Sequence, residues 1–412
     1  MPDKTPHILI TGAGVGGLAL AQGLKRNNIP FTVFERDAFL DSRRQGYRLK
    51  ISNDMAARLQ SAITPESWTM VKGTCAEVGF GETNLNATDA GVLASRKEKL
   101  PPGAVPPLSA DRGLLRQAFM EGIQENVRFG KKLVSYEVFN TGDDGVGDDA
   151  GVVRVSFEDG TTAEGTFLVG ADGSRSVVRA QHLSGHEFLD MGVCCLYGKS
   201  PLNDELQARF PERHRRWITV VRDQTPIIQS IIARKTSPVI MVCEACHFTN
   251  RETYPHLPQD YVHFGFMFPR DILGKGLSDD QVDEKLRGDP SSVALDITSE
   301  WDPSIRSLIE LQDRDLTYGM RILSAPESIP AWETSSRVTA IGDAVHLMSP
   351  TGGVGAVAAL NDAVLLSKII SEEGVSTSSI RKFEDGMREF AAVCIRRSLL
   401  AGYQMLDLPA AS

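Results

Sequence analysis

The first residues whose types and spacing can do chemistry form a G-x-G-x-x-G pattern near the N-terminus, at Gly12, Gly14 and Gly17. The first glycine permits a tight turn, the second lets a pyrophosphate approach the backbone, and the third lets a helix pack closely. Glu35, with Arg36 beside it, follows the last glycine by 18 residues, where a carboxylate can accept both ribose hydroxyls. The pattern predicts a dinucleotide site, and by itself leaves FAD and NAD open.

A second group of motifs lies in the last quarter of the chain: Gly342-Asp343, then Pro350-Thr351-Gly352-Gly353-Val354-Gly355-Ala356, then Asn361-Asp362-Ala363. With these motifs most of the chain resembles the aromatic-hydroxylase (class A) flavoprotein monooxygenases. In that family the Asp that matches Asp343 binds the ribityl chain of FAD. The resemblance implies that the glycine-rich turn places a helix N-terminus at the pyrimidine edge of the isoalloxazine. The cofactor-binding residues it implies here are Gly342, Asp343, Pro350, Gly353, Gly355 and Ala356.

Further positions carry the resemblance into the middle of the chain. Asp172, followed by Gly173, resembles a family fingerprint associated with FAD and nicotinamide binding, although an Asp there can equally cap the next helix. Arg112 matches an arginine that contacts the flavin nucleotide, and the alternative is a surface arginine. Arg44, Gly46 and Arg48 lie in a stretch that family members place beside the flavin.

Two departures from the family pattern concern the glycine-rich turn. Val357 stands where many members carry Asn, and Val354 replaces a frequent Gln. These departures put side-chain contacts to the flavin ring in doubt and leave the backbone contacts intact. The chain is similar in this respect to fungal secondary-metabolite members of the family.

The resemblance also implies a reaction. In the family a nicotinamide reduces FAD, O₂ adds at flavin C4a, and the hydroperoxide transfers oxygen to an electron-rich carbon. We therefore expect non-covalent FAD, NAD(P)H as a transient co-substrate, and a small aromatic, indole or polyketide-like substrate that is hydroxylated or epoxidised. Arg48, Tyr197 and Lys199 are candidate catalytic residues on the substrate side, although strand alternation can also turn the last two toward solvent. The alternatives are an FAD oxidase or dehydrogenase without oxygen insertion, and a non-catalytic flavin-containing binding protein.

The elements that must position these residues begin with a βαβ unit: a strand at 7–11, a helix to about residue 27 and a strand at 31–34. Two later strand-to-helix junctions follow strands at 167–170 and 337–341, the second leading to a helix at 355–370. A further helix is predicted at 111–124, and a hairpin at 133–157 with its tip at 141–151. Between residues 183 and 318 the pattern changes to strands at 217–221, 227–233, 239–243 and 261–268.

The predicted fold class is α/β, a Rossmann-like FAD-binding fold built from discontinuous segments with an inserted β-sheet substrate domain and a C-terminal helix. The FAD-binding domain is assigned to residues 1–73, 111–182 and 319–373, and the substrate domain to 74–110 and 183–318. Residues 374–412 form the C-terminal helical segment. Phe264, Phe266 and Phe268 share one strand face, which favours a hydrophobic core over an aromatic-lined pocket.

Composition excludes several classes of protein. A net charge of −9 offers no basic face for nucleic acid, and no apolar run is long enough to span a membrane. Without a secretory signal we expect a cytoplasmic protein whose six cysteines are reduced. The c-type haem attachment pattern is matched by Cys243-Glu244-Ala245-Cys246-His247, but we favour the interpretation that these cysteines are buried thiols in a strand. No metal site is predicted, and the oligomeric state is left open.

Overall fold

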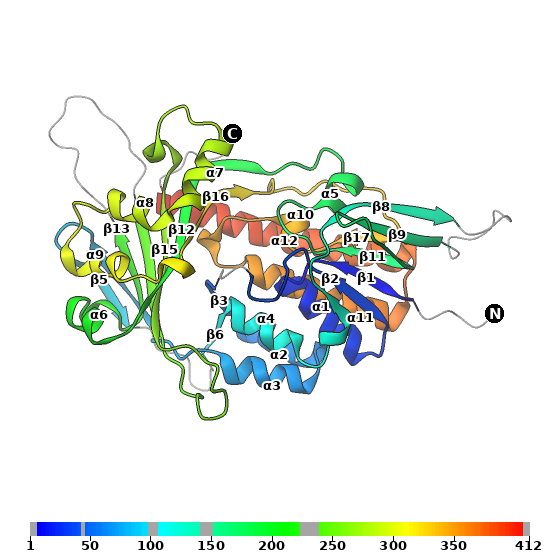
Figure 1. Cartoon of the computed structure of the whole chain (residues 1–412), viewed down its shortest axis with the longest axis horizontal. Coiled ribbons are helices and arrows are strands. Elements are labelled where there is room, and N and C mark those ends of the chain that lie inside the picture. The colour runs from blue at the N-terminus through cyan, green and yellow to red at the C-terminus, as the bar shows by residue number, and fades with distance from the viewer. Residues whose placement is uncertain (1–5, 43–45, 98–105, 141–150, 223–238, 407–412) are drawn as a thin grey trace.

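A computed structural model describes residues 6–42, 46–97, 106–140, 151–222 and 239–406. Two large sheets lie toward opposite ends of the molecule's long axis (Figure 1). The smaller one carries the glycine-rich motifs, and the larger one is formed mainly by the middle of the chain.

The smaller sheet has five parallel strands in the order β17-β11-β1-β2-β7. The strands are β1 (Ile8–Thr11), β2 (Phe31–Phe34), β7 (Val127–Arg128), β11 (Phe167–Gly170) and β17 (Val338–Ala340). All residues of β1, β11 and β17 are buried, as expected for a parallel sheet covered on both faces. Strands from widely separated parts of the sequence pair directly, which confirms the predicted discontinuous Rossmann-like fold.

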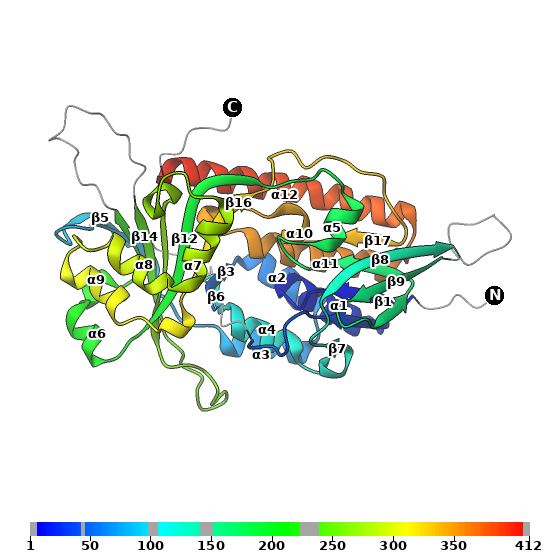
Figure 2. The same ribbon diagram turned by 45° about the horizontal axis from the view of Figure 1, so that its top comes forward.

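Most of the remaining elements on this side are helices. They are α1 (Val15–Arg26), α2 (Asn53–Ala62), α3 (Pro65–Thr74), α4 (Arg112–Met120), α5 (Val177–His182), α10 (Asp343–His346), α11 (Gly355–Glu373) and α12 (Thr377–Leu406), with short 3₁₀ turns η1 (Gln124–Asn126) and η5 (Pro350–Gly352). Helix α11 packs along both α1 and α12. Figure 2 shows α12, in red, extending from this side toward the larger sheet.

Two small antiparallel sheets complete this side of the molecule. One contains β8 (Leu133–Asn140), β9 (Gly151–Phe157) and β10 (Thr162–Gly165), as the predicted hairpin requires. The expected hairpin tip at 141–151 lies, except for its last residue, outside the described residues. The other small sheet pairs β3 (Arg48–Ile51) with β6 (Leu108–Asp111), which leads directly into α4.

The larger sheet has seven strands in the order β16-β12-β15-β14-β13-β4-β5. The strands are β4 (Gly81–Asn86), β5 (Val92–Lys97), β12 (Leu189–Pro201), β13 (Ile218–Arg222), β14 (Ile240–Cys246), β15 (Tyr261–Pro269) and β16 (Tyr318–Ser324). One face is covered by α6 (Asp204–Arg209), α7 (Asp279–Gly288), α8 (Pro290–Ile297) and α9 (Pro303–Glu310). Phe264, Phe266 and Phe268 are fully buried in this layer, so they form core rather than a pocket wall. The predicted strand at 227–233 lies outside the described residues.

Helices α7, α8 and α9 were missed in the sequence because each is short and lies among strands. Their N-terminal signals are nevertheless present. Ser278 and Gln281 form a capping box at α7, and Asp289 and Asp302 cap α8 and α9 ahead of a proline at the first helical position.

The division into domains remains a proposal, to which the strand order adds one detail. Strands β4 and β5 join the seven-stranded sheet, in the same unit as residues 183–318. Strand β16 also pairs in this sheet, which argues for moving the boundary proposed at residue 319 to the end of β16. Among the described residues, no helix combines the length and apolarity needed to cross a membrane.

Candidate functional site

The glycine-rich loop after β1 has the backbone shape that its sequence predicts. Gly12 has φ +104°, and a Cβ there would overlap the carbonyl oxygen of Ala171. A Cβ at Gly17 would overlap the carbonyl oxygen of Gly12. Gly14 is different, because a Cβ there would meet no other atom within 4 Å. The loop is therefore packed against protein at its ends and open at the glycine that should face a pyrophosphate.

The helix that follows offers its N-terminus to a ligand. No side chain caps α1, and its first turn contains no acidic residue, so its amides and dipole can act on an anion. Glu35 is 6% exposed and accepts hydrogen bonds from the backbone N–H groups of Ala13 (2.8 Å) and Asp37 (3.0 Å). The carboxylate thus lies beside the glycine-rich loop, as a ribose-binding residue must.

Helix α4 supports this loop from the other side. The buried guanidinium of Arg116 donates to the carbonyl oxygens of Ala13 (2.9 Å) and Leu40 (2.8 Å). Sequence reasoning gave Arg116 no role, because its partners lie far away along the chain. Arg112, one turn earlier, lies 5.5 Å from the ring centroid of Tyr47, and its backbone N–H donates to the carbonyl oxygen of Tyr47.

The junction after β17 presents Asp343. Gly342 adopts φ +62°, a conformation that favours glycine, and the Asp343 side chain that follows is exposed to solvent. Protein nevertheless surrounds this carboxyl closely enough to raise its pKa, against the opposing effects of His346 and Arg112. A carboxylate that is accessible to solvent but closely surrounded by protein is well placed to be covered by a polar ligand.

Two buried residues hold this junction from behind. Asp362 of α11 accepts hydrogen bonds from the Gly342 backbone N–H (2.9 Å) and from Nε2 of His346 (2.5 Å). Burial alone would lower the pKa of His346, but the adjacent Asp362 carboxylate raises it overall. Asp362 was quoted in the sequence motif, whereas its contact with the histidine was not foreseen.

The glycine-rich turn before α11 also has room for a ligand. Gly353 has φ +62°, and no atom would meet a Cβ there within 4 Å. No side chain caps α11 and its first turn lacks acidic residues. The turn itself is braced by α12, since Thr351 donates to the carbonyl oxygen of Ser398 at 2.7 Å. Gly355 and Ala356 open the helix, and Pro350 opens the turn.

Asp172 makes the contacts of a helix cap. It accepts hydrogen bonds from the Ser176 hydroxyl (2.5 Å) and the Val177 backbone N–H (2.8 Å), at the start of α5. Arg179 then joins this turn to the next junction by donating to the carbonyl oxygen of Ala344 at 3.3 Å. The capping contacts leave open whether Asp172 also faces a cofactor, and that role remains a proposal.

An aromatic cluster lies near Arg112, on the face of the seven-stranded sheet that helices α6 to α9 do not cover. The Tyr197 ring lies 5.3 Å from Tyr47, 5.5 Å from Tyr318 and 5.8 Å from His263, centroid to centroid. Tyr318 Oη and His263 Nδ1 are buried without a hydrogen-bond partner among the described residues. Burial, with Arg48 and Lys199 nearby, lowers the pKa of His263 well below its ordinary value. Tyr318 and His263 were not predicted, because their strands are far apart in sequence.

The other two candidate catalytic residues are engaged in ion pairs. Arg48 lies 2.8 Å from Glu244, which Lys50 approaches at 3.2 Å. Lys199 forms a buried ion pair with Asp111. Neither cation is therefore free to act alone as an acid or base. Of the remaining candidates, Arg36 is exposed, Gly46 lies beside the Lys199 ammonium group, and Arg44 is outside the described residues.

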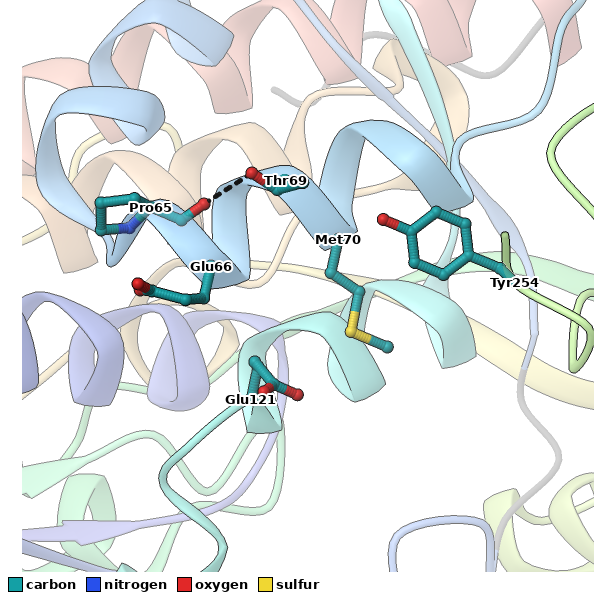
Figure 3. Close-up of a pocket in the computed structure, with 6 residues that line it drawn as sticks. All are labelled: Pro65, Glu66, Thr69, Met70, Glu121 and Tyr254. Atoms are coloured by element: carbon teal, nitrogen blue, oxygen red, sulfur yellow. Dashed lines mark hydrogen bonds between the residues drawn. The ribbon is translucent and has the colours of Figure 1, made fainter. Parts of the chain in front are cut away.

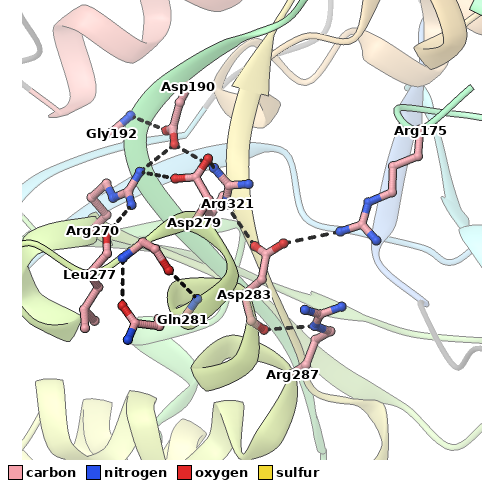
Figure 4. A network of polar contacts seen from close by, with 11 residues as sticks. Arg175, Asp190, Gly192, Arg270, Leu277, Asp279, Gln281, Asp283, Arg287 and Arg321 are labelled. Atoms are coloured by element: carbon pink, nitrogen blue, oxygen red, sulfur yellow. Dashed lines mark hydrogen bonds and ion pairs between the residues drawn. The ribbon is translucent and has the colours of Figure 1, made fainter. Parts of the chain in front are cut away.

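Two other polar or hollow regions lie away from these groups. A surface pocket is lined by Pro65, Glu66, Thr69, Met70, Glu121 and Tyr254, and it shares no residue with the candidate site (Figure 3). A network of arginines and aspartates joins β12, β16 and α7, and Arg175 reaches it from the turn after Asp172, 3.3 Å from Asp283 (Figure 4).

The cysteine motif has a structural explanation. Cys243 and Cys246 are three residues apart on β14, so their side chains point to opposite faces, and both are buried. Each of the six cysteines is free. Over the residues that the structure describes, no group of His, Cys, Asp and Glu side chains is placed to hold a metal ion.

Comparison with known proteins assigns the class. A protein-family model described as an FAD binding domain matches residues 329–380, which contain Asp343 and the glycine-rich turn. The structure of 2,6-dihydroxypyridine-3-hydroxylase from Arthrobacter nicotinovorans is similar to this fold, with a TM-score of 0.72 and 16% identity over 98% of this chain and 93% of that one. The family match thus places an FAD-binding domain in this part of the chain, and the structural similarity shows that the overall fold is shared with this hydroxylase.

Two fungal relatives make the relationship more specific. The chain is 41% identical, over 90% of its length, to the dual O-methyltransferase/FAD-dependent monooxygenase elcB of Phaeosphaeria nodorum, of which the match covers 40%. It is 37% identical, over 98% of its length, to the similarly named CTB3 of Cercospora beticola, of which it covers 46%. The chain therefore spans less than half of either relative. The resemblance to FAD-dependent monooxygenases is confirmed by these two fungal homologues, whose names include that activity.

Proposed function

We propose that the chain is a single-component FAD-dependent monooxygenase that uses NAD(P)H and O₂ to hydroxylate or epoxidise a small electron-rich substrate. The observation that carries this proposal is Asp343, an accessible carboxylate on a turn that the buried Asp362 holds. The N-termini of α1 and α11, which no side chain caps, add two places for a ligand. The homology to FAD-dependent monooxygenases supports the same assignment. The O-methyltransferase activity in the names of those relatives is not part of the proposal.

The residues present fit FAD. The open Gly14 and the N-terminus of α1 would receive the pyrophosphate, and Glu35 the adenosine ribose. Asp343 would accept the ribityl hydroxyls, and the N-terminus of α11 would lie at the pyrimidine edge of the ring. Arg112 would pair with the nucleotide, since its guanidinium lies against the Tyr47 ring and the Asp343 carboxylate is close enough to help raise its pKa.

The bound FAD would supply the redox chemistry, taking a hydride equivalent from NAD(P)H and passing an oxygen atom from O₂ to the substrate. The chain would hold the substrate and exclude water. The aromatic cluster of Tyr47, Tyr197 and Tyr318 offers an apolar surface against which a flat ligand would pack, and His263 stacks on Tyr197 within it. Arg48 and Lys199 would stay protonated in their ion pairs and would not transfer a proton to the substrate.

The first test is of the cofactor. Purified protein should be yellow, and acid precipitation should release FAD into the supernatant, because all of the proposed contacts are non-covalent. A pellet that stays yellow would contradict non-covalent binding, and a colourless preparation that takes up no FAD would remove the proposed site.

The second test is of the reaction. NADH and NADPH consumption and peroxide release should be followed with and without hydroxynaphthalenes, hydroxyanthraquinones and indoles as probes, under ¹⁸O-labelled O₂. The monooxygenase proposal requires that a probe stimulates NAD(P)H oxidation and that one ¹⁸O atom enters the product. Turnover with stoichiometric peroxide and no label in the product would establish the oxidase alternative. FAD that is bound but never reduced would favour a binding protein.

A further inference from the structure

One buried carboxylate links the seven-stranded sheet to the helix that carries two of the arginines beside the proposed FAD site. Asp111 is 5% exposed and stands at the end of β6, immediately before α4. Its Oδ1 caps α4 by accepting the backbone N–H groups of Gly113 (2.8 Å) and Leu114 (3.3 Å). Its Oδ2 accepts hydrogen bonds from Lys199 and from the hydroxyl of Tyr261, the latter at 2.7 Å.

Both of the latter donors come from the sheet. Lys199 lies on β12 and Tyr261 on β15, and the ammonium group is 4.5 Å from the centroid of the Tyr261 ring. Lys199 is 9% exposed and reaches across to the backbone at Gly46, where any side chain would collide with its ammonium group. The lysine therefore reaches from the substrate side into the other half of the molecule.

Helix α4 in turn touches the proposed cofactor site at two places. Arg112 lies against Tyr47, and Arg116 holds the carbonyl oxygen of Ala13 inside the glycine-rich loop. A shift of the first turn of α4 would move Arg112 directly, and Arg116 lies only one turn further along the helix. Oδ1 of Asp111 caps that first turn, and Lys199 holds the same side chain in place through Oδ2.

We propose that Lys199 is a positioning residue for the cofactor: by holding Asp111 it fixes α4, and so sets how tightly the chain binds FAD. The proposal rests on the proposed function, in that FAD is the ligand. Breaking a buried ion pair from one side leaves the other charge uncompensated, which costs far more than removing both charges together. The pair therefore predicts a specific pattern of FAD affinities.

The experiment titrates FAD into folded apoprotein and follows the quenching of flavin fluorescence. Lys199→Met should raise the Kd for FAD by about tenfold or more, because the unpaired Asp111 carboxylate disturbs the start of α4. Lys50→Met is the matched control, since Glu244 keeps its contact with Arg48, and its Kd should stay within about twofold of wild type. Urea unfolding of each apoprotein separates a loss of affinity from a loss of stability.

The double variant Asp111→Asn/Lys199→Met tests the pair itself. The amide can still cap α4 and no buried charge is unpaired, so it should bind FAD more tightly than Lys199→Met alone. The single variant Asp111→Asn, titrated in the same way, completes the cycle. If the effects of Asp111→Asn and Lys199→Met on the Kd simply multiply in the double variant, or if folded Lys199→Met binds FAD like wild type, the proposal is overturned. Should Lys199→Met not fold, Tyr261→Phe decides, with an expected Kd rise of about threefold and an unchanged Kd overturning it. Wild-type protein that binds no FAD removes the proposed function and this role together.

Discussion

Asp362 holds Nε2 of His346 and the backbone N–H of Gly342 with the same carboxylate oxygen, at 2.5 and 2.9 Å. The histidine and the aspartate side chains are each 1% exposed. The turn that presents Asp343 thus depends on a buried ion pair whose cationic partner can lose its proton. This gives the protein a pH dependence that can be measured without any ligand.

His346→Gln should destabilise the apoprotein by about 3 kcal/mol at low pH, because it leaves Asp362 buried without a cation. The pKa of His346 is raised in the fold, so its contribution is complete below the unfolded value of about 6.5 and is lost as pH rises through the folded pKa. Urea unfolding across that range should show the two proteins converging at high pH. The exposed His256→Gln is the control, and a gap that widens with pH would contradict the assignment.

Asp343→Asn should have opposite effects on binding and stability. A charged hydrogen bond to the ribityl chain contributes about 1.5–3 kcal/mol, so FAD affinity should fall about tenfold to hundredfold. The apoprotein should become more stable at neutral pH, because the fold raises the pKa of Asp343 and therefore disfavours its charged form. Thermal melts at a pH near the ordinary pKa of Asp should show no gain in the stability of Asp343→Asn over the wild type. An unchanged Kd would remove Asp343 from the site.

Glu35→Ala should also weaken FAD binding by about tenfold or more, through the adenosine ribose. Because Glu35 and Asp343 would contact opposite parts of the dinucleotide, their losses should multiply in the double variant. Titrations of the two single variants and the double variant with FAD check this. A double variant no weaker than Asp343→Asn would mean that Glu35 does not face the same ligand.

The thiols should be inert in the native state. Burial raises the pKa of Cys75, Cys194, Cys195 and Cys246 to about 12 and that of Cys394 to about 11, and it also raises that of Cys243. A thiol reagent should therefore titrate the six cysteines only after unfolding. Rapid reaction of a pair in the folded protein would revive a dithiol role for Cys243 and Cys246.

The sequence allowed the nucleotide-binding half to be predicted because its constraints are local. Gly17 is required by a close backbone contact with Gly12 inside one strand-turn-helix unit, and Gly12 and Gly342 each have a positive φ at a tight turn. Such glycines can be recognised within a few consecutive residues, so the predicted bounds of the neighbouring strands and helices were close to those in the structure.

The substrate side could not be predicted in the same way, because its contacts join distant strands. Lys199 meets Asp111 across 88 residues, and nothing in either neighbourhood marks the other as its partner. Strand alternation could place Tyr197 and Lys199 on one face of β12, but could not say which face looks toward α4. That choice depends on which face the helices α6 to α9 cover.

The order of the core strands also has a consequence for biosynthesis. Strand β1 is the first of the five to be made, yet its neighbour β11 begins about 160 residues later, and β17 completes the sheet about 170 residues after that. A ribosome-bound chain therefore carries an unfinished nucleotide fold while the whole seven-stranded sheet is being made, with the edge of β11 unpaired. Because Asp343 and the start of α11 are the last of the proposed cofactor contacts to be translated, the nascent chain cannot assemble the full set until both have followed β17 out of the ribosome. Flavin capture should accordingly be a late event in synthesis, and flavin starvation should expose this chain to aggregation at that stage.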